Sequence, residues 1–285
     1  MKTKVKELKV KHPKVSYIQT SRYEYKNLKD LSDRLKDYIS LSITKEMIDI
    51  ADELYEIYYN MLYTKQKFQS ILFVDGSWKH KNPKVSGWGF VLIVPIYDKD
   101  STSYQFIVKL GSGNSNYNLF NKRFSEYTTM RNVLGELMAT TNGIETLVNI
   151  LNIDIDEECK FKRMTRTLCI FPQRNLNIFY DYSGIESWVI GEWQTKNALT
   201  KWYKEFMRQV SFEIPIIFQK VKAHSTSTLN DTVDFLAKNG IKAHNVELFS
   251  NGPIIEISEF EEGLSLYDLS ILIAYHIVIT RTYHF

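Results

Sequence analysis

The order in which β-rich and helical segments follow one another constrains the fold of this chain more than any other feature. Three short β-rich segments succeed each other at hairpin distance and predict an antiparallel meander: residues 70–77, 87–95 and 103–110. A helical segment at about 132–151 comes next, followed by apolar strands at 176–181 and 214–221 with helices between and after them. This order predicts an α/β fold, a five-stranded mixed sheet with helices on both faces.

The two ends of the chain differ in composition from this pattern. Residues 1–66 combine a lysine-rich tail with apolar residues at helical spacing near 28–39 and 48–61, and predict a basic tail with a helical appendage. Residues 67–244 contain the whole strand and helix pattern and form the main predicted domain. Residues 245–285 are acidic with an apolar end, and predict a C-terminal extension that packs on the core or meets a partner. Neither end predicts any chemistry.

The overall composition is that of an ordinary globular protein. Hydrophobic residues make up 44% of the chain and charged residues 24%, which argues against disorder. The longest apolar run, residues 269–280, is too short to span a bilayer, and residues 1–14 lack the apolar stretch of a secretory signal. Two cysteines, Cys159 and Cys169, cannot alone form a disulfide framework or a four-ligand zinc site. We therefore expect a cytoplasmic protein that does not contact a membrane.

The charge is unevenly distributed along the chain. The formal net charge is +3, but residues 66–244 carry 22 basic and 17 acidic side chains, whereas residues 245–285 carry 1 and 6. A moderately basic middle region permits a phosphate-bearing partner without requiring one.

Four acidic residues stand where hydrophobic burial does not explain them: Asp75, Glu136, Asp181 and Asp234. The first and third end apolar strands, and the other two lie among apolar residues on helices. Taken singly, each could be a turn residue, a cap or a solvated helix position. Neighbouring strands lie about 4.8 Å apart, so acids at two adjacent strand ends would disfavour each other's ionisation unless a cation lay between them. Oxygen ligands without thiolates suit Mg²⁺ or Mn²⁺, and two such ions can promote phosphodiester hydrolysis.

The segments around these acids resemble those of type 1 ribonucleases H. The matching segments are 73–77 (FVDGS), 131–137 (RNVLGEL), 180–188 (YDYSGIESW) with 191–193 (GEW), and 221–225 (VKAHS), followed by Asn230 and 234–238 (DFLAK). They occur in the family's order over about residues 68–242, so the resemblance makes 67–244 a ribonuclease H-like catalytic domain. One DGS turn is common, but the four segments together are specific.

The resemblance implies a metal-dependent endonuclease that cuts the RNA strand of an RNA–DNA hybrid and leaves 5′-phosphate and 3′-hydroxyl ends. It implies two Mg²⁺ ions, replaceable by Mn²⁺, with Asp75 bridging both, Asp234 at one, and Glu136 and Asp181 at the other. His224 matches a loop histidine that moves protons or helps the product leave. The implied catalytic residues are therefore Asp75, Glu136, Asp181, His224 and Asp234.

A further set of residues is implied to contact the hybrid. Asn132 matches a residue that reads the minor groove, and Gly76 would let backbone approach the RNA. Trp202 lies near two lysines and could line a backbone groove or equally pack in the core. The implied nucleic-acid contacts are Gly76, Ser77, Asn132, Lys201, Trp202, Lys204 and Asn230.

The sequence also departs from the family pattern. Insertions are expected at 111–130 and 152–174, Thr226 and Ser227 replace the usual glycine and acid after the histidine, and the N-terminal region does not match the family's hybrid-binding module. Two other functions stay open: a DNA nuclease of the same fold, of the resolvase or transposase type, and a catalytically silent hybrid-binding module. The first usually lacks the YDYxGIExW and KAHS segments. The second would gain affinity by losing the four acids.

Overall fold

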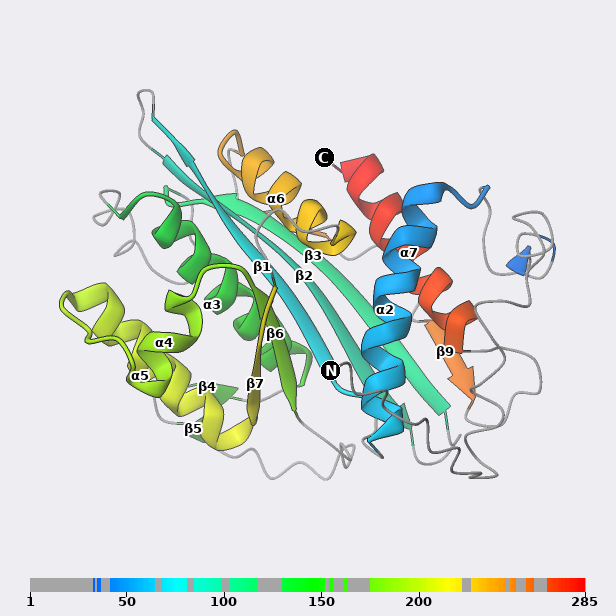
Figure 1. The fold of residues 1–285 in the computed structure, drawn as a ribbon, viewed down its shortest axis with the longest axis horizontal. Helices are drawn as coiled ribbons and strands as arrows, with labels where there is room; N and C mark the ends of the chain where they lie inside the picture. Colours follow the sequence, from blue (N-terminus) through cyan, green and yellow to red (C-terminus); the bar gives the residue numbers. More distant parts are fainter. Residues whose placement is uncertain are drawn as a thin grey trace, which may run out of the picture.

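The computed structural model of the chain describes residues 33, 35–36, 42–64, 68–80, 85–98, 103–116, 130–151, 154–155, 161–162, 175–221, 227–243, 247–249, 255–258 and 266–284. One mixed β-sheet lies at the centre of the molecule, with helices to either side of it (Figure 1). The lysine-rich tail and most of the helix predicted near 28–39 lie outside the described residues.

The predicted five strands are all present and lie in the order β7-β6-β1-β2-β3. β1 (Ser70–Lys79), β2 (Val85–Asp98) and β3 (Ser103–Asn114) form the antiparallel meander. β6 (Leu176–Tyr180) and β7 (Ile216–Lys220) continue the sheet from β1 in parallel. The predicted α/β fold with a mixed sheet is therefore confirmed.

Short strands that the sequence did not predict add to this sheet and form a second one. β8 (Glu247–Phe249) and β9 (Ile255–Ser258) both pair with β3 and come from the predicted C-terminal extension. β4 (Asp154–Ile155) and β5 (Phe161–Lys162) pair with each other within the predicted insertion at 152–174.

Each face of the sheet carries its own apolar core because the side chains of β1 alternate. Leu72 and Val74 pack with α3 (Asn132–Ile150), α4 (Gly184–Ile190) and α5 (Ala198–Glu213). Ile71 and Phe73 pack with α2 (Lys45–Tyr63), α6 (Thr228–Gly240) and α7 (Leu266–His284). A strand that is covered on both faces has apolar residues at successive positions, and β1 begins with such a run, residues 71–74.

The two end regions share a core with the main domain. α2 buries Met47, Ile50, Leu54 and Tyr58, which recur at helical spacing, against the sheet and α7. α7 contains the apolar run that the sequence showed at 269–280 and is buried on nearly all sides between α2 and β3. The domain boundaries predicted at 66 and 244 stay a prediction.

Within the part of the chain that the structure describes, no helix has the length and apolar character needed to cross a membrane. The cytoplasmic location stays a prediction from the sequence.

Candidate active site

Three of the four predicted acids meet where β1 and β6 run side by side. The parallel register pairs Phe73 with Phe179, so Asp75 and Asp181 each come two residues after a paired position. Glu136 reaches the same place from α3. One carboxylate oxygen of each acid lies within 4.8 Å of the others. The prediction that Asp75 ends the first strand was wrong, because β1 stays paired with β2 as far as Lys79. What stops near Asp75 is the pairing with β6.

Two glycines let α3 approach the strands closely enough to bring Glu136 to Asp75. A Cβ atom on Gly76 would lie 2.5 Å from the carbonyl oxygen of Asn132 and 2.8 Å from the carbonyl carbon of Gly135. A Cβ atom on Gly135 would lie 2.9 Å from the Cα atom of Gly76 and would overlap the carbonyl oxygen of Gly87. Helix α3 therefore sits directly on the backbone of β1 and β2.

This packing explains why a glycine is needed at position 76 in a way that the sequence did not suggest. The space beside its Cα atom is filled by the backbone of α3, so that space is not an opening for RNA. The half-buried backbone of Gly76 is still a proposed hybrid contact.

Burial and mutual repulsion change the acidity of the two innermost acids. Burial, and next the charge of Asp181, raise the pKa of Asp75 to about 7 from its ordinary value of 3.8. Burial, and next the charges of Asp75 and Asp181, raise the pKa of Glu136 well above its ordinary value. Glu136 is 2% exposed, and its Oε2 atom has no hydrogen-bond partner among the described residues. An unpartnered buried oxygen and acids that repel one another fit a divalent cation, which would stabilise their charged forms.

Asp234 lies on α6 near this group but is not one of the three that meet. Its charge contributes to the raised pKa of Asp75, after burial and the charge of Asp181. Its Oδ2 atom pairs with Lys238 Nζ at 2.5 Å, one turn along the helix. A metal bound through Asp234 would have to compete with Lys238. Lys238 lies in the matching segment 234–238, and its spacing of four residues from Asp234 is a helical pairing signal, but the resemblance implied no role for it.

The residues implied to contact nucleic acid fall into two sets. Asn132, the first residue of α3, and Lys201 on α5 are exposed, and Gly76, Ser77 and Lys204 are half-buried. The second set packs against other side chains of the protein or is buried. Asn230 in the first turn of α6 is 7% exposed, and the half-buried Trp202 stacks on Phe206 with 5.4 Å between the ring centroids. The structure thus shows the core packing that the sequence left open for Trp202, and its contact with a hybrid stays a proposal.

An aromatic cluster beside the acids was not predicted as part of the site. Tyr182 follows Asp181, and the charge of Glu136 adds to burial in raising the pKa of the Tyr182 hydroxyl. Its ring lies 5.9 Å from that of Trp188 and 6.1 Å from that of Trp193, measured between centroids. Trp193 is 41% exposed, so the cluster reaches the surface. His224 belongs to residues 222–226, which lie outside the described residues, and its role stays a proposal.

A comparison with known proteins found one curated protein with a similar sequence. The chain is 29% identical over 181 residues, 60% of its length, to a curated protein named Ribonuclease H from Caldicellulosiruptor saccharolyticus, of which 95% is covered. This relative and the motif segments support a ribonuclease H family for the chain. No family model matches it.

Solved ribonuclease H structures are also similar to the chain, but only weakly. RNase H1 from the halophilic archaeon Halobacterium salinarum has 14% identity and a TM-score of 0.39, covering 61% of this chain and 98% of that one. LC11-RNase H1 in complex with an RNA/DNA hybrid has 15% identity and a TM-score of 0.35, covering 61% of this chain and 96% of that one. The support for a ribonuclease H family comes from the curated relative and from the motif segments.

We expect Mg²⁺ to raise the temperature of thermal unfolding more at pH 8 than at pH 5.5. An acid whose pKa is raised by folding binds protons more readily in the folded state, so stability falls as the pH rises toward the raised pKa, about 7 for Asp75. A cation on the ionised acids offsets that loss. At 100 times its Kd it would contribute about 2.7 kcal/mol, a rise on the order of 5 °C for a chain of this size.

Thermal unfolding with Mg²⁺ or with EDTA at the two pH values measures this effect. The Asp75→Asn variant is the matched control, because it removes a negative charge from the group without changing its shape. Equal shifts at both pH values, or the same shifts in the variant, would contradict a cation site at these acids.

Proposed function

We propose that the chain is a metal-dependent endonuclease that hydrolyses the RNA strand of RNA–DNA hybrids and leaves 5′-phosphate and 3′-hydroxyl ends. The observation that carries the proposal is the meeting of Asp75, Glu136 and Asp181, with a buried Glu136 oxygen that has no partner among the described residues. The name of the curated relative supports the substrate class. A pure binding module for a polyanion would gain affinity by replacing these acids.

The acids would hold two Mg²⁺ ions, for which Mn²⁺ can substitute. Asp75 would bridge them, with Asp234 at one and Glu136 and Asp181 at the other. When bound, such ions lower the pKa of an attacking water and stabilise the charge on the leaving oxygen. The chain itself would fix the acids: β1 and β6 set the spacing of Asp75 and Asp181, and the glycine contacts hold α3 against the strands.

Other residues of the chain would bind the hybrid and move protons. His224 would transfer protons or help the product leave. Lys201, which is exposed, and Lys204, which is half-buried, lie on α5 and would contact phosphates, so hybrid affinity should fall with rising salt. The remaining proposed contacts are Gly76, Ser77, Asn132, Trp202 and Asn230.

The experiment that tests the proposal compares labelled RNA–DNA, RNA–RNA and DNA–DNA duplexes of one sequence with Mg²⁺, Mn²⁺ or EDTA. We expect cleavage only of the RNA strand of the hybrid, only with metal, and products that carry 5′-phosphates. Cleavage of DNA–DNA would favour a nuclease of the resolvase or transposase type. Hybrid binding without cleavage under any metal condition would favour a silent binding module.

We expect Asn132→Ala to slow hybrid cleavage several-fold and to weaken the recognition of ribose. Asn132 lies one turn before Glu136 with its side chain exposed, so it can point from the acids along the bound strand. Its amide offers a donor and an acceptor, as a 2′-hydroxyl does, and such a bond contributes about 1 kcal/mol. The measurement is cleavage of hybrids with single deoxyribose substitutions next to the scissile phosphate. If these substitutions slowed the wild type and the variant equally, Asn132 would not read the sugar.

A further inference from the structure

Helix α6 packs on the sheet beside the three acids that meet, and it carries Asp234, the fourth predicted acid. The antiparallel register pairs Asp75 of β1 with Gly89 of β2. A Cβ atom on Gly89 would lie 2.7 Å from the carbonyl oxygen of Val233 and 2.5 Å from the backbone nitrogen of Ala237. The turn of α6 that contains Asp234 therefore lies directly on the strand position next to Asp75. A shift of α6 would move the fourth acid relative to the other three.

A glutamate of the N-terminal helix α2 caps the first turn of α6. Glu53 Oε1 accepts a hydrogen bond from Ser227 Oγ at 2.6 Å, and Glu53 Oε2 accepts one from the backbone N–H of Leu229 at 3.1 Å. Ser227 Oγ in turn accepts from the N–H of Asn230 at 3.0 Å, one turn before Asp234. A carboxylate at a helix N-terminus is electrostatically favourable and satisfies N–H groups that have no partner within the helix. Glu53 thus holds the turn of α6 that precedes Asp234.

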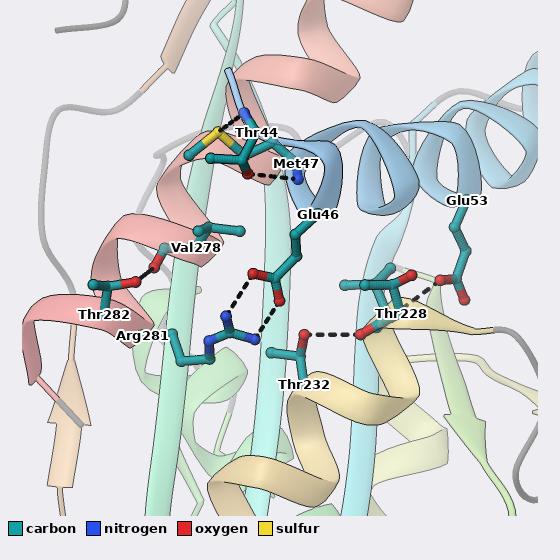
Figure 2. A network of polar contacts seen from close by, with 10 residues as sticks. Thr44, Glu46, Met47, Glu53, Thr228, Thr232, Val278, Arg281 and Thr282 are labelled. Carbon is teal, nitrogen blue, oxygen red and sulfur yellow. Dashed lines mark hydrogen bonds and ion pairs between the residues drawn. The ribbon is translucent and has the colours of Figure 1, made fainter. Parts of the chain in front are cut away.

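Helix α2 also contacts α6 through α7. Glu46 of α2 pairs with Arg281 of α7 at 2.5 Å. The Arg281 guanidinium lies 5.2 Å from the ring centroid of Phe235, the residue that follows the fourth acid on α6. Figure 2 shows Glu46 beside Arg281 and, on the same helix, Glu53 beside Thr228. Helix α2 therefore holds α6 both before and after the fourth acid.

The packing of α2 fixes the place of Glu53 in turn. Its neighbours on the helix, Ile50 and Leu54, are fully buried in the apolar core. The hydroxyl of Tyr267 on α7 donates to Asp52 Oδ1 at 3.0 Å, a bond that joins α2 to α7 and does not involve α6. Glu53 is thus a fixed point against which the start of α6 is placed.

We propose that Glu53 is a positioning residue for Asp234. By holding Ser227 and the first turn of α6, it sets the place of the Asp234 carboxylate relative to Asp75, and so the affinity of the site for a divalent cation. Lys238 lies on α6 and moves with Asp234, whereas a cation at Asp75 does not, so a shift of α6 favours the lysine over the cation. The inference rests on the proposed function, whose metal site includes Asp234. It gives a role in metal binding to a helix outside the segments that match the family.

The first experiment titrates Mg²⁺ against the temperature of thermal unfolding in Glu53→Ala and in Tyr267→Phe. The second variant is the matched control, because it removes the bond to Asp52 and loosens α2 without a change at α6. We expect the half-saturating Mg²⁺ concentration to rise about tenfold in Glu53→Ala, since residues that orient metal ligands contribute about 10- to 100-fold in affinity. It should stay within about twofold of the wild type in Tyr267→Phe. Equal half-saturation in the two variants would overturn the proposal.

Glu53→Gln decides the question if Glu53→Ala does not fold. It keeps one acceptor oxygen for the start of α6 and loses the charge. Its half-saturating Mg²⁺ concentration should lie at least about twofold above that of the wild type and below the tenfold rise expected for alanine. The same half-saturation as in the wild type would contradict a positioning role.

The second experiment asks whether Glu53 acts through Asp234. Asp234→Asn should itself raise the half-saturating Mg²⁺ concentration, because it removes a ligand. In that background Glu53→Ala should add less than about twofold, since there is no carboxylate left to misplace. Effects that multiply would overturn the proposal and leave Glu53 a purely structural residue. So would an Asp234→Asn variant that binds Mg²⁺ as the wild type does.

A third measurement needs neither metal nor substrate. Amide hydrogen exchange at residues 227–231 should be faster in Glu53→Ala than in Tyr267→Phe, because the cap is lost only in the first. Equal exchange in the two variants would overturn the inference. A wild type that binds Mg²⁺ but cleaves no hybrid would instead refute the proposed function, and the Mg²⁺ titrations would still decide the role of Glu53.

Discussion

Asp75→Asn should abolish hybrid cleavage while leaving the fold intact. Asp75 is 8% exposed and lies where β1 separates from β6, with Glu136 and Asp181 within reach of a shared cation. Asparagine has the same shape but loses the charge that would bridge two metal ions. We expect the single-turnover rate to fall by at least about 10³-fold, since the ions would stabilise both the attacking and the leaving oxygen.

The fold should tolerate this change because the charge of Asp75 is not used for stability. The raised pKa of Asp75 means that ionising it in the folded, metal-free protein is unfavourable. The metal-free variant should therefore unfold at the same temperature as the wild type or higher. The control is Asp49→Asn, at an exposed position on α2. Wild-type turnover by Asp75→Asn would contradict the site, whereas loss of hybrid binding together with turnover would point to a binding role for Asp75.

The three acids that meet in the structure, Asp75, Glu136 and Asp181, each follow a local signal in the sequence. Asp75 breaks an apolar run within β1 and Asp181 directly follows the apolar β6, so their meeting needed only the parallel pairing of the two strands. The apolar run at 269–280 packs as part of the buried helix α7. Signals of this kind lie within a few residues of the feature that they predict.

The features that the sequence did not predict depend on contacts between distant residues. The bond between Glu53 and Ser227 joins positions 174 residues apart, and nothing near Glu53 distinguishes it from the other glutamates of α2. The pairing of β8 and β9 with β3 involves segments of three and four residues, too short to show a strand period. The close approach of α3 to Gly76 was not predicted, because the sequence does not show which backbone lies beside this glycine.

Gly76→Ala should both destabilise the protein and inactivate it. The added Cβ atom would lie 2.5 Å from the carbonyl oxygen of Asn132 and 2.8 Å from the carbonyl carbon of Gly135, and neither backbone atom can move without shifting α3. Overpacking a core typically costs about 1–3 kcal/mol, and a clash with backbone should reach the upper end of that range. Because α3 carries Glu136, we expect cleavage to fall by about 10²-fold even in the fraction that stays folded.

Gly143→Ala is the matched control on the same helix. Its added Cβ atom would lie 2.5 Å from Leu72 Cδ1, the end of a buried side chain, and not against backbone as at Gly76. An alanine in a helix also gains about 0.5–1 kcal/mol over glycine, which offsets part of the cost. Denaturant unfolding and single-turnover cleavage of both variants make the comparison. If Gly76→Ala were as stable and as active as Gly143→Ala, the contact between β1 and α3 would not be what holds Glu136 at the acids.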